Sequence, residues 1–522
     1  MKSIFSIISI IILTTAFSSF AYDSYEEYVR KQMNEYQTYL EEIDREFTSF
    51  LKQTWQPYEG EKPKQLLDKP KPVDIPVAKP MPKPEPIKIK PKPKPVVEKP
   101  KPQPKPIIKD EKPKPAPKPV VKPEPVVPEP MVKEPVVKEP VVTVPEPEPQ
   151  YVPQQEPEGF GLSFYGTNLD IPVDKKFLTP VKNPLSSKNI AKWWETIASS
   201  DYKKTLKYLQ KSADKMQIGD WGYVNLVERF AAKLLGKTPE RKMLVWFFLN
   251  KAGYDAKLGY SKSGITKVMM PSDSQLFGTP FYTFSNVRYY VIDVFGRKEP
   301  TESLYTYNGK YPAAKKILSM SKMDYPKLGF AGYSRDLKFE TGGKNYVINA
   351  IANRYSIAYL NNFPQADLSV YTNAKTPDWI EQTILPELKK ILKGKSKRES
   401  INILLKFVQT AFEYKTDDVQ FGREKFLFTE ETLYYPFSDC EDRSVLFAYL
   451  VGKLTDLDLI MLDFPGHIAV AVDLGAENTG AVVDFKGKSY SVTDPTYINA
   501  TAGMIMPQYK RTNPEIIEPQ LR

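Results

Sequence analysis

The feature that most constrains this 522-residue chain is a stretch from about Glu61 to Gln150 in which proline recurs every few residues. It reads KPKP, KPEP and EPEP, with almost no glycine. Because proline fixes φ, lacks an N–H donor and disfavours helix in the preceding residue, such a stretch cannot build a packed core. We expect a disordered, extended polyproline II linker with a contour on the order of 250 Å.

A single cysteine and a single histidine limit the chemistry available to the chain. No internal disulfide can form and a histidine-rich metal site is excluded, so we expect neither a metal nor a cofactor. The formal charge is +11, but many of the lysines lie in the proline-rich stretch and no basic helix carries interleaved aromatics. We therefore expect no nucleic-acid partner. A loose attraction to anionic cell-envelope polymers or to peptidoglycan fits the charge better.

The first 21 residues are typical of an export signal. Lys2 supplies the charged start, Ile4 to Phe17 the apolar run, and Ser19-Phe20-Ala21 a cleavage site before Tyr22. The run is at the short end for crossing a bilayer, so cleavage is favoured over retention as an anchor. The proline-rich stretch resembles the periplasm-spanning linker of TonB in composition, which implies the periplasm of a Gram-negative bacterium.

A helix is predicted between the signal and the linker. Ser24 and Glu27 form a capping-box pattern at its start. Apolar residues then recur at alternating spacings of four and three, as in a heptad seam: Val29, Met33, Tyr36, Leu40, Ile43, Phe47 and Phe50. Two interpretations remain open. The helix lies on the globular part of its own chain, or it forms a short coiled coil through residues 24–55 that makes the protein a homo-oligomer.

Globular sequence begins near Gly159. Residues 187–235 show helical patterning, and residues 329–372 alternate in the manner of strands, with a turn at Gly342-Gly343. Two further helices are predicted at DWIEQTILPELKKIL and SINILLKFVQTAFEY. The predicted class is α+β.

The chain also resembles itself at an offset of 202 residues (441 − 239). PERKMLVWFFLNK, from Pro239, aligns with EDRSVLFAYLVGK, from Glu441. At the same offset Gly264 matches Gly466, and with one residue of slippage Asp293 matches Asp494. The upstream segment has Thr238 and Ile265 where the downstream one has the chain's only cysteine and only histidine. Either the upstream segment is a degenerate duplicate, or two amphipathic helices followed by strands are alike by chance.

The cysteine lies in a pattern that predicts a reactive thiol. Ser438 and Glu441 suggest a capping box, which would place Cys440 in the first helical turn, where the helix dipole favours a thiolate. The acidic neighbours of Cys440 oppose this, so a nearby imidazolium is also needed. His467 opens one alternating strand and Asp494 closes another, and neighbouring antiparallel strands can bring the two side chains together.

Each of these residues would have its own role in nucleophilic catalysis by the Cys440 thiol. His467 would take the thiol proton and Asp494 would orient the imidazole. The oxyanion would be held by the Cys440 backbone N–H and by one upstream donor. The candidates for that donor are Gln420, Tyr434 and Tyr435.

The order Cys, His, Asp, with DC before a helix, GH opening a strand and a DPT ending, resembles the transglutaminase-like superfamily of papain-like cysteine enzymes. The resemblance implies a nucleophile at Cys440, a base at His467 and an orienting acid at Asp494. With it, the predicted organisation follows the chain: signal 1–21, amphipathic or coiled-coil helix 22–56, proline-rich linker 57–158, degenerate transglutaminase-like copy 159–300, β-rich connection 301–380 and catalytic domain 381–522.

The leading functional prediction is an exported cysteine hydrolase or acyltransferase that acts on amide bonds of envelope peptides or proteins through a thioester. Two alternatives stay open. The globular part is a peptide-binding module without catalysis, or the chain is a structural tether of the cell envelope.

Overall fold

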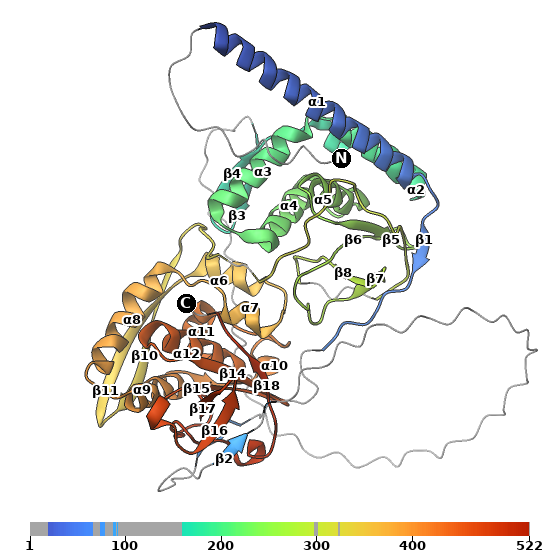
Figure 1. The fold of residues 1–522 in the computed structure, drawn as a ribbon. Helices are drawn as coiled ribbons and strands as arrows, with labels where there is room; N and C mark the ends of the chain where they lie inside the picture. Colours follow the sequence, from blue (N-terminus) through green and yellow to red (C-terminus); the bar gives the residue numbers. More distant parts are fainter. Residues whose placement is uncertain are drawn as a thin grey trace, which may run out of the picture. The chain divides into compact units, whose positions relative to one another are not determined.

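The structure, a computed structural model, describes residues 19–65, 74–78, 87–89, 91, 159–296, 301–321 and 324–520. Within these ranges the protein is α+β, with helices packed on two six-stranded sheets (Figure 1). The predicted class is therefore confirmed. The predicted signal falls almost wholly outside the described residues, as does most of the proline-rich linker. Among the described residues, no helix combines the length and the apolar character needed to cross a membrane.

The described part of helix α1 (Ser19–Leu51) includes Ser24, so the predicted cap residue lies inside the helix. Its second half packs on α2 (Ser187–Ala198) and buries Ile43, Phe47 and Leu51 in the main hydrophobic core. The ring of Phe47 meets that of Trp194 edge-on at 5.0 Å. The helix thus lies on its own chain through this half. The coiled coil stays a prediction for the first half, where the side chains of Val29, Met33 and Tyr36 lie outside the described residues.

The first sheet is built around one buried helix. Helix α5 packs on α4, β5 and β6, and its residues from Met243 to Leu249 are fully buried. The helices of this part are α3 (Tyr202–Met216), α4 (Gly219–Leu235) and α5 (Pro239–Lys251). The sheet runs in the order β1 (Gln56–Tyr58), β9 (Leu304–Thr306), β5 (Lys257–Tyr260), β6 (Thr266–Met270), β8 (Val287–Val291) and β7 (Phe281–Phe284).

Between the two sheets the chain forms a long hairpin and several helices. The predicted turn at Gly342-Gly343 is confirmed, since both glycines adopt positive φ between β10 (Gly332–Thr341) and β11 (Lys344–Asn353). The predicted helix pair is confirmed as α8 (Asp378–Leu392) and α9 (Lys397–Thr410). The remaining elements are the hairpin β3 (Phe160–Phe164) and β4 (Thr167–Ile171), and the helices α6 (Arg354–Asn361) and α7 (Leu368–Thr372).

The second sheet follows helix α12 (Cys440–Leu454), which packs against its strand β15. Its order is β18 (Glu515–Ile517), β14 (Leu459–Phe464), β15 (His467–Val472), β17 (Lys488–Thr493), β16 (Ala481–Phe485) and β2 (Ile87–Ile89). Three short elements precede α12, namely α10 (Asp417–Gln420), α11 (Thr429–Tyr434) and the two-residue strand pair β12 (Glu413–Tyr414) with β13 (Phe437–Ser438).

The two sheets share one topology. The orders β9-β5-β6-β8-β7 and β18-β14-β15-β17-β16 are the same pattern, and every neighbouring pair in both is antiparallel. The register also matches: Met269 pairs with Val291, and their counterparts at offsets of 202 and 201 residues, Ala471 and Val492, pair with each other. This agreement favours a duplication over chance similarity.

Some elements cross the predicted boundaries. The first sheet includes β9, beyond residue 300, and residues 301–380 contain helices α6 and α7 as well as strands. The linker 57–158 is not free along its first part. Backbone pairing at β1, at residues 61–64 and 76–78, and at β2 holds it to the globular part. Proline does not prevent these contacts because they use edge strands and single bridges.

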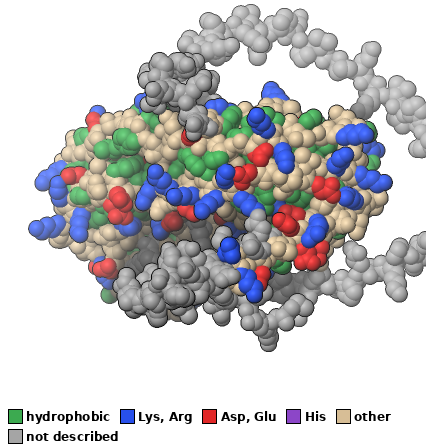
Figure 2. All heavy atoms as spheres, turned by 90° about the horizontal axis from the view of Figure 1, so that it is seen from above, with side chains coloured by type: hydrophobic (Ala, Val, Ile, Leu, Met, Phe, Trp, Pro, Cys, Tyr) green, Lys and Arg blue, Asp and Glu red, His purple; other side chains and the backbone are tan. Residues whose placement is uncertain are grey.

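The surface carries charges of both signs. On the face drawn in Figure 2, lysine and arginine side chains are interspersed with aspartate and glutamate among the described residues, and they do not gather into one basic patch.

Candidate thiol active site

Cys440 is the first residue of α12, as the sequence predicted, but the helix cap differs from the prediction. The N-cap is Asp439, whose backbone N–H donates to the Asp442 carboxylate at 3.3 Å. Ser438 cannot be the cap because it pairs with Tyr414 in the β12–β13 ladder, and its hydroxyl accepts from Arg443 at 3.1 Å. The thiol therefore lies at the positive end of the helix dipole.

The charged groups around the start of α12 have opposing effects on the stability of a Cys440 thiolate. Cys440, Glu441 and Asp442 are buried, and the thiol of Cys440 donates to the Glu441 carboxylate at 3.1 Å. A carboxylate so close disfavours the thiolate. Arg443 lies one turn along the helix, where burial lowers its pKa to about 10. It is still a cation at neutral pH and attracts a negative charge on the sulfur.

His467 and Asp494 meet as the sequence predicted. The Nε2 of His467 lies 2.8 Å from Oδ2 of Asp494, and each residue is 1% exposed. The other carboxylate oxygen, Oδ1, accepts the backbone N–H groups of Thr496 at 2.9 Å and Tyr497 at 3.1 Å. Asp494 is thus fixed by the turn that follows β17. Nδ1 of His467 is buried and has no hydrogen-bond partner within the described part of the chain, so it remains available for a proton.

Contacts with shared neighbours bring Cys440 to this pair. One turn after Cys440, the Ser444 hydroxyl donates to the carbonyl of Ile468, next to His467, at 3.0 Å. The ring of Tyr509 stacks on that of His467, with centroids 5.2 Å apart and planes 14° apart. Burial, and after it the negative charges of Cys440 and Asp494, raise the pKa of Tyr509 to about 12. The cysteine and the His467–Asp494 pair therefore share one neighbourhood.

Two residues that support this arrangement were not predicted. Gln409 of α9 is buried, and its amide nitrogen donates to the carbonyls of Asp494, Tyr497 and Ala500 at 3.2, 2.9 and 3.1 Å. It holds the loop that carries the acid. Tyr509 covers one face of the imidazole. No local pattern could have marked either residue, because the contact of Gln409 with Asp494 spans 85 positions.

The three oxyanion candidates have different surroundings. Gln420 ends α10, and its side-chain oxygen is buried without a hydrogen-bond partner among the described residues. The ring of Tyr434 packs against Tyr333 at 4.8 Å, and that of Tyr435 packs against Phe421 at 5.2 Å. These packing contacts account for both tyrosines without an oxyanion role, so the role of all three stays a prediction.

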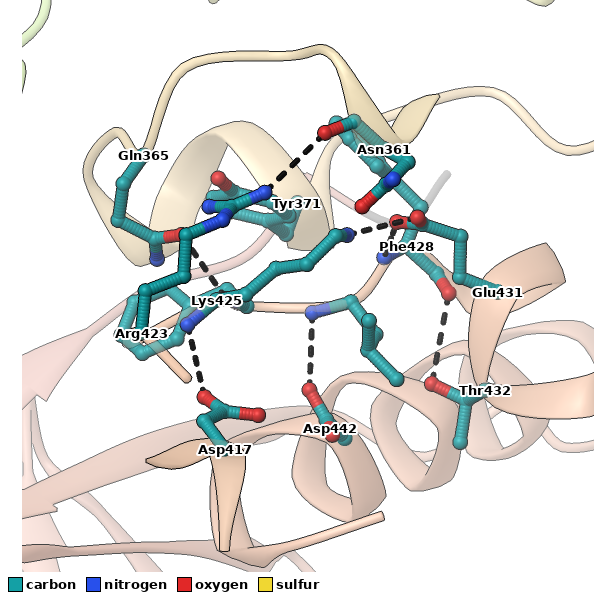
Figure 3. Close-up of polar contacts among 12 residues, drawn as sticks. Asn361, Gln365, Tyr371, Asp417, Arg423, Lys425, Phe428, Glu431, Thr432 and Asp442 are labelled. Carbon is teal, nitrogen blue, oxygen red and sulfur yellow. Dashed lines mark hydrogen bonds and ion pairs between the residues drawn. The ribbon is translucent and has the colours of Figure 1, made fainter. Parts of the chain in front are cut away.

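A buried polar network orders the segment in front of α12 (Figure 3). The backbone N–H of Lys425 donates to Asp417 and that of Leu427 to Asp442, both at 2.8 Å, and the Lys425 amine meets Glu431 at 2.6 Å. Asp442 is two residues beyond Cys440, so this segment is tied directly to the helix that carries the thiol.

Carboxylates of this network come close enough to share a cation. The oxygens of Asp417, Glu424 and Glu441 lie within 4.8 Å of one another, as do those of Asp417, Asp439 and Asp442. The backbone N–H groups of Lys425 and Leu427 already donate to Asp417 and Asp442, and the buried Arg443 interacts electrostatically with Asp439 and Asp442. Its observed partners explain it as the scaffold of the helix start.

The chain matches no protein-family model, and neither a curated protein nor a solved structure was found to match it. The interpretation of the site therefore depends on its own geometry.

Proposed function

We propose that the protein is an exported cysteine hydrolase or acyltransferase of the transglutaminase-like type, acting on amide bonds. The observation that carries the proposal is the buried His467–Asp494 hydrogen bond of 2.8 Å beside the helix that begins at Cys440. The chain has no other cysteine and no other histidine. A cysteine at a helix start, an imidazole and an orienting carboxylate are the three parts that a thiol nucleophile requires.

In the proposed reaction, Nδ1 of His467 takes the thiol proton and the Cys440 thiolate attacks the amide carbonyl. Asp494 holds the imidazole through Nε2 and stabilises the imidazolium. The tetrahedral oxyanion accepts the Cys440 backbone N–H at the helix start. When the intermediate collapses, the C–N bond breaks, the imidazolium protonates the leaving amine, and a thioester remains on Cys440. Water, deprotonated by His467, then releases the acid and restores the thiol.

The hydrogen bond between the Cys440 thiol and Glu441 must break during this cycle. Its carboxylate accepts from the thiol at 3.1 Å, so attack requires the sulfur to exchange this partner for His467. The thiol form is stabilised at rest and the thiolate forms only when the imidazole is in place.

The substrate class follows from the predicted export. Stem peptides of peptidoglycan and side-chain amides of other envelope proteins are the amide substrates that an exported enzyme meets. In water, without a bound amine acceptor, hydrolysis exceeds transfer. We place the protein in the periplasm of a Gram-negative bacterium, with its positive charge favouring anionic envelope polymers.

A second candidate is a peptide-binding module without catalysis. It is favoured by one observation: the second sheet accepts an extended segment, β2, in parallel at the edge of β16. Main-chain pairing at a sheet edge is a common mode of peptide recognition. In this reading the segment of the same chain shows the kind of ligand that the edge takes.

A covalent adduct distinguishes the two. The full-length protein is mixed with peptidoglycan stem peptides and with an extract of exported proteins, and its intact mass is measured. The enzyme acquires an acyl group on Cys440 that hydroxylamine removes, and the Cys440→Ala variant does not. If the wild type forms no adduct and releases no more product than Cys440→Ala, the catalytic proposal is wrong and the binding module is favoured.

A further inference from the structure

The site is closed by the C-terminal part of the chain. Cys440, His467 and Asp494 are each 1% exposed, so no substrate reaches them without a movement. Tyr509, which stacks on His467, belongs to a short 3-10 helix, Pro507–Tyr509. The next ordered pairing beyond it is β18 against β14. The segment from residue 504 to residue 512 is therefore a cover that is held at its two ends.

The beginning of the proline-rich stretch holds one end of this cover. The N–H of Ala78 donates to the carbonyl of Ile498 at 2.8 Å, and the N–H of Ile498 donates to the carbonyl of Pro76 at 2.9 Å. Ala78 is buried in a small cluster with Tyr497, Ala500 and Met506, against which Tyr509 also packs.

The same stretch is anchored a second time nine positions further along (87 − 78). Strand β2 pairs with β16, and Ile89 is buried in the core of the second sheet with neighbours such as Val483 and Val492. The contact at Ala78 is the weaker of the two, since it consists of two backbone hydrogen bonds and one small side chain. Contacts with few buried apolar atoms open before the sheets to which they are attached.

We propose that residues 74–78 are a latch that keeps the cover closed over the thiol site, and that release of the latch admits substrate. The latch belongs to the stretch that leads into the proline-rich linker, and strand β2 lies between the latch and the rest of the linker. The control of substrate access rests on the proposed function. The contact that residues 74–78 make with the cover does not depend on that function.

Only a few contacts connect the latch with the cover and with the loop that carries Asp494. Tyr497 follows Asp494 by three positions, and its N–H donates to the Asp494 carboxylate. Met506 precedes Tyr509 by three positions and its carbonyl accepts the Tyr509 N–H at 3.0 Å. Ala78 belongs to one buried hydrophobic cluster with Tyr497 and Met506. Removing Ala78 from this cluster therefore loosens the loop of the acid and the cover of the imidazole together.

The test uses Ala78→Pro in the full-length protein. Proline removes the N–H that donates to Ile498 and cannot occupy the packed position of alanine. The matched control is Val77→Ala, because the Val77 side chain is 58% exposed and its backbone is unchanged by the substitution. Iodoacetamide labels Cys440, the only cysteine, and the rate is read from the intact mass. We expect Ala78→Pro to label roughly three- to tenfold faster than wild type, as the loss of one net hydrogen bond predicts.

Hydrogen exchange measured on the same variants shows where the structure opens. Exchange is expected to rise in residues 496–512 and to stay unchanged in β10 and β11. Equal labelling of Ala78→Pro and wild type overturns the latch. Faster labelling accompanied by faster exchange in β10 and β11 also overturns it, since the substitution then loosens the whole domain. If labelling accelerates locally but His467→Ala does not slow it, the latch stands and the proposed catalytic function fails.

Discussion

The two sheet modules share a framework and differ in chemistry. Gly264 and Gly466 both precede the second strand with positive φ, and the register of the following strands agrees. Yet the position of His467 is held upstream by Ile265, whose side chain is 49% exposed, whereas His467 is 1% exposed. The cysteine position is held by Thr238, the N-cap of α5. The framework therefore does not require a cysteine or a histidine at these two positions, which agrees with the role proposed for them downstream.

Unlike the cysteine and the histidine, the aspartate is present in both modules. Oδ1 of Asp293 accepts the N–H of Phe295 at 3.2 Å, and Oδ1 of Asp494 accepts that of Thr496 at 2.9 Å, two positions on in each case. This carboxylate oxygen closes the turn after the strand in both modules. Only Asp494 uses its second oxygen for an imidazole. A structural role thus explains why the acid is present without the histidine.

A second contrast concerns two buried glutamates at the same offset of 202 (430 − 228). Glu228 forms ion pairs with Arg241 at 2.6 Å and Lys242 at 3.1 Å, all three being buried. Glu430 accepts the N–H of Asn353 at 3.2 Å, and burial raises its pKa to about 8. One buried acid lies against two cations, and the other keeps its proton at neutral pH.

Glu228→Ala should give the largest change in stability. The substitution leaves the two buried cations of Arg241 and Lys242 without their carboxylate, which typically costs about 3–5 kcal/mol. Denaturant unfolding with a probe in the upstream module measures it, and Asp201→Ala, on the surface, serves as the control. A loss below about 1 kcal/mol would show that the ion pairs contribute little to this module.

Glu430→Gln should change the pH dependence of stability. A glutamate with the ordinary pKa of 4.5 ionises in the unfolded chain, while folded Glu430 stays protonated up to about pH 8. Unfolding therefore releases a proton in this window, so stability falls as pH rises from about 4.5 to 8 and levels off above it. The expected loss is about 3–5 kcal/mol. Urea unfolding at several pH values should show this slope for wild type and its removal in Glu430→Gln. An unchanged slope would contradict the assignment.

Asp494→Asn should show that Asp494 has a role in thiol reactivity that Asp293 lacks. The amide still accepts the N–H of Thr496 through its oxygen but cannot stabilise an imidazolium at His467. We expect iodoacetamide to label Cys440 about ten- to thirtyfold more slowly at pH 6.5. The matched variant Asp293→Asn, in the upstream module, should label at the wild-type rate. Equal effects of the two substitutions would mean that the downstream acid has only its turn role.

Glu441→Gln should have the smallest effect on the labelling rate of Cys440, and it should raise that rate. Removing the carboxylate that accepts from the thiol should raise the labelling rate of Cys440 by about two- to fivefold, because a like charge no longer opposes the thiolate. Asp418→Asn, an exposed neighbour in sequence of buried Asp417, is the control for a general change in charge. Slower labelling in Glu441→Gln would show that this carboxylate assists deprotonation.

Local patterns predicted the parts of this molecule that depend on neighbouring residues. Alternation and turn glycines located the β10–β11 hairpin, helical periodicity located α8 and α9, and the GH and DPT motifs led to the contact between His467 and Asp494. The cap of α12 was misassigned because pairing of Ser438 with Tyr414, which depends on a second strand, outweighs its capping propensity.

Contacts between distant parts of the chain could not be predicted in this way. Strand β2 joins the second sheet almost four hundred positions before its partner β16 (481 − 87), and proline-rich composition by itself indicates a free linker. Tyr509 and Gln409 act through packing and hydrogen bonds that no periodicity encodes.

The central claim is that His467 activates Cys440, and the most direct measurement is the rate at which iodoacetamide labels Cys440 at pH 6.5 in wild type and in His467→Ala. A free thiol is about 1% thiolate at that pH, so an activated one reacts up to about 100-fold faster. We expect wild type to be labelled at least tenfold faster than His467→Ala, with both proteins folded to the same extent. Equal rates would contradict it.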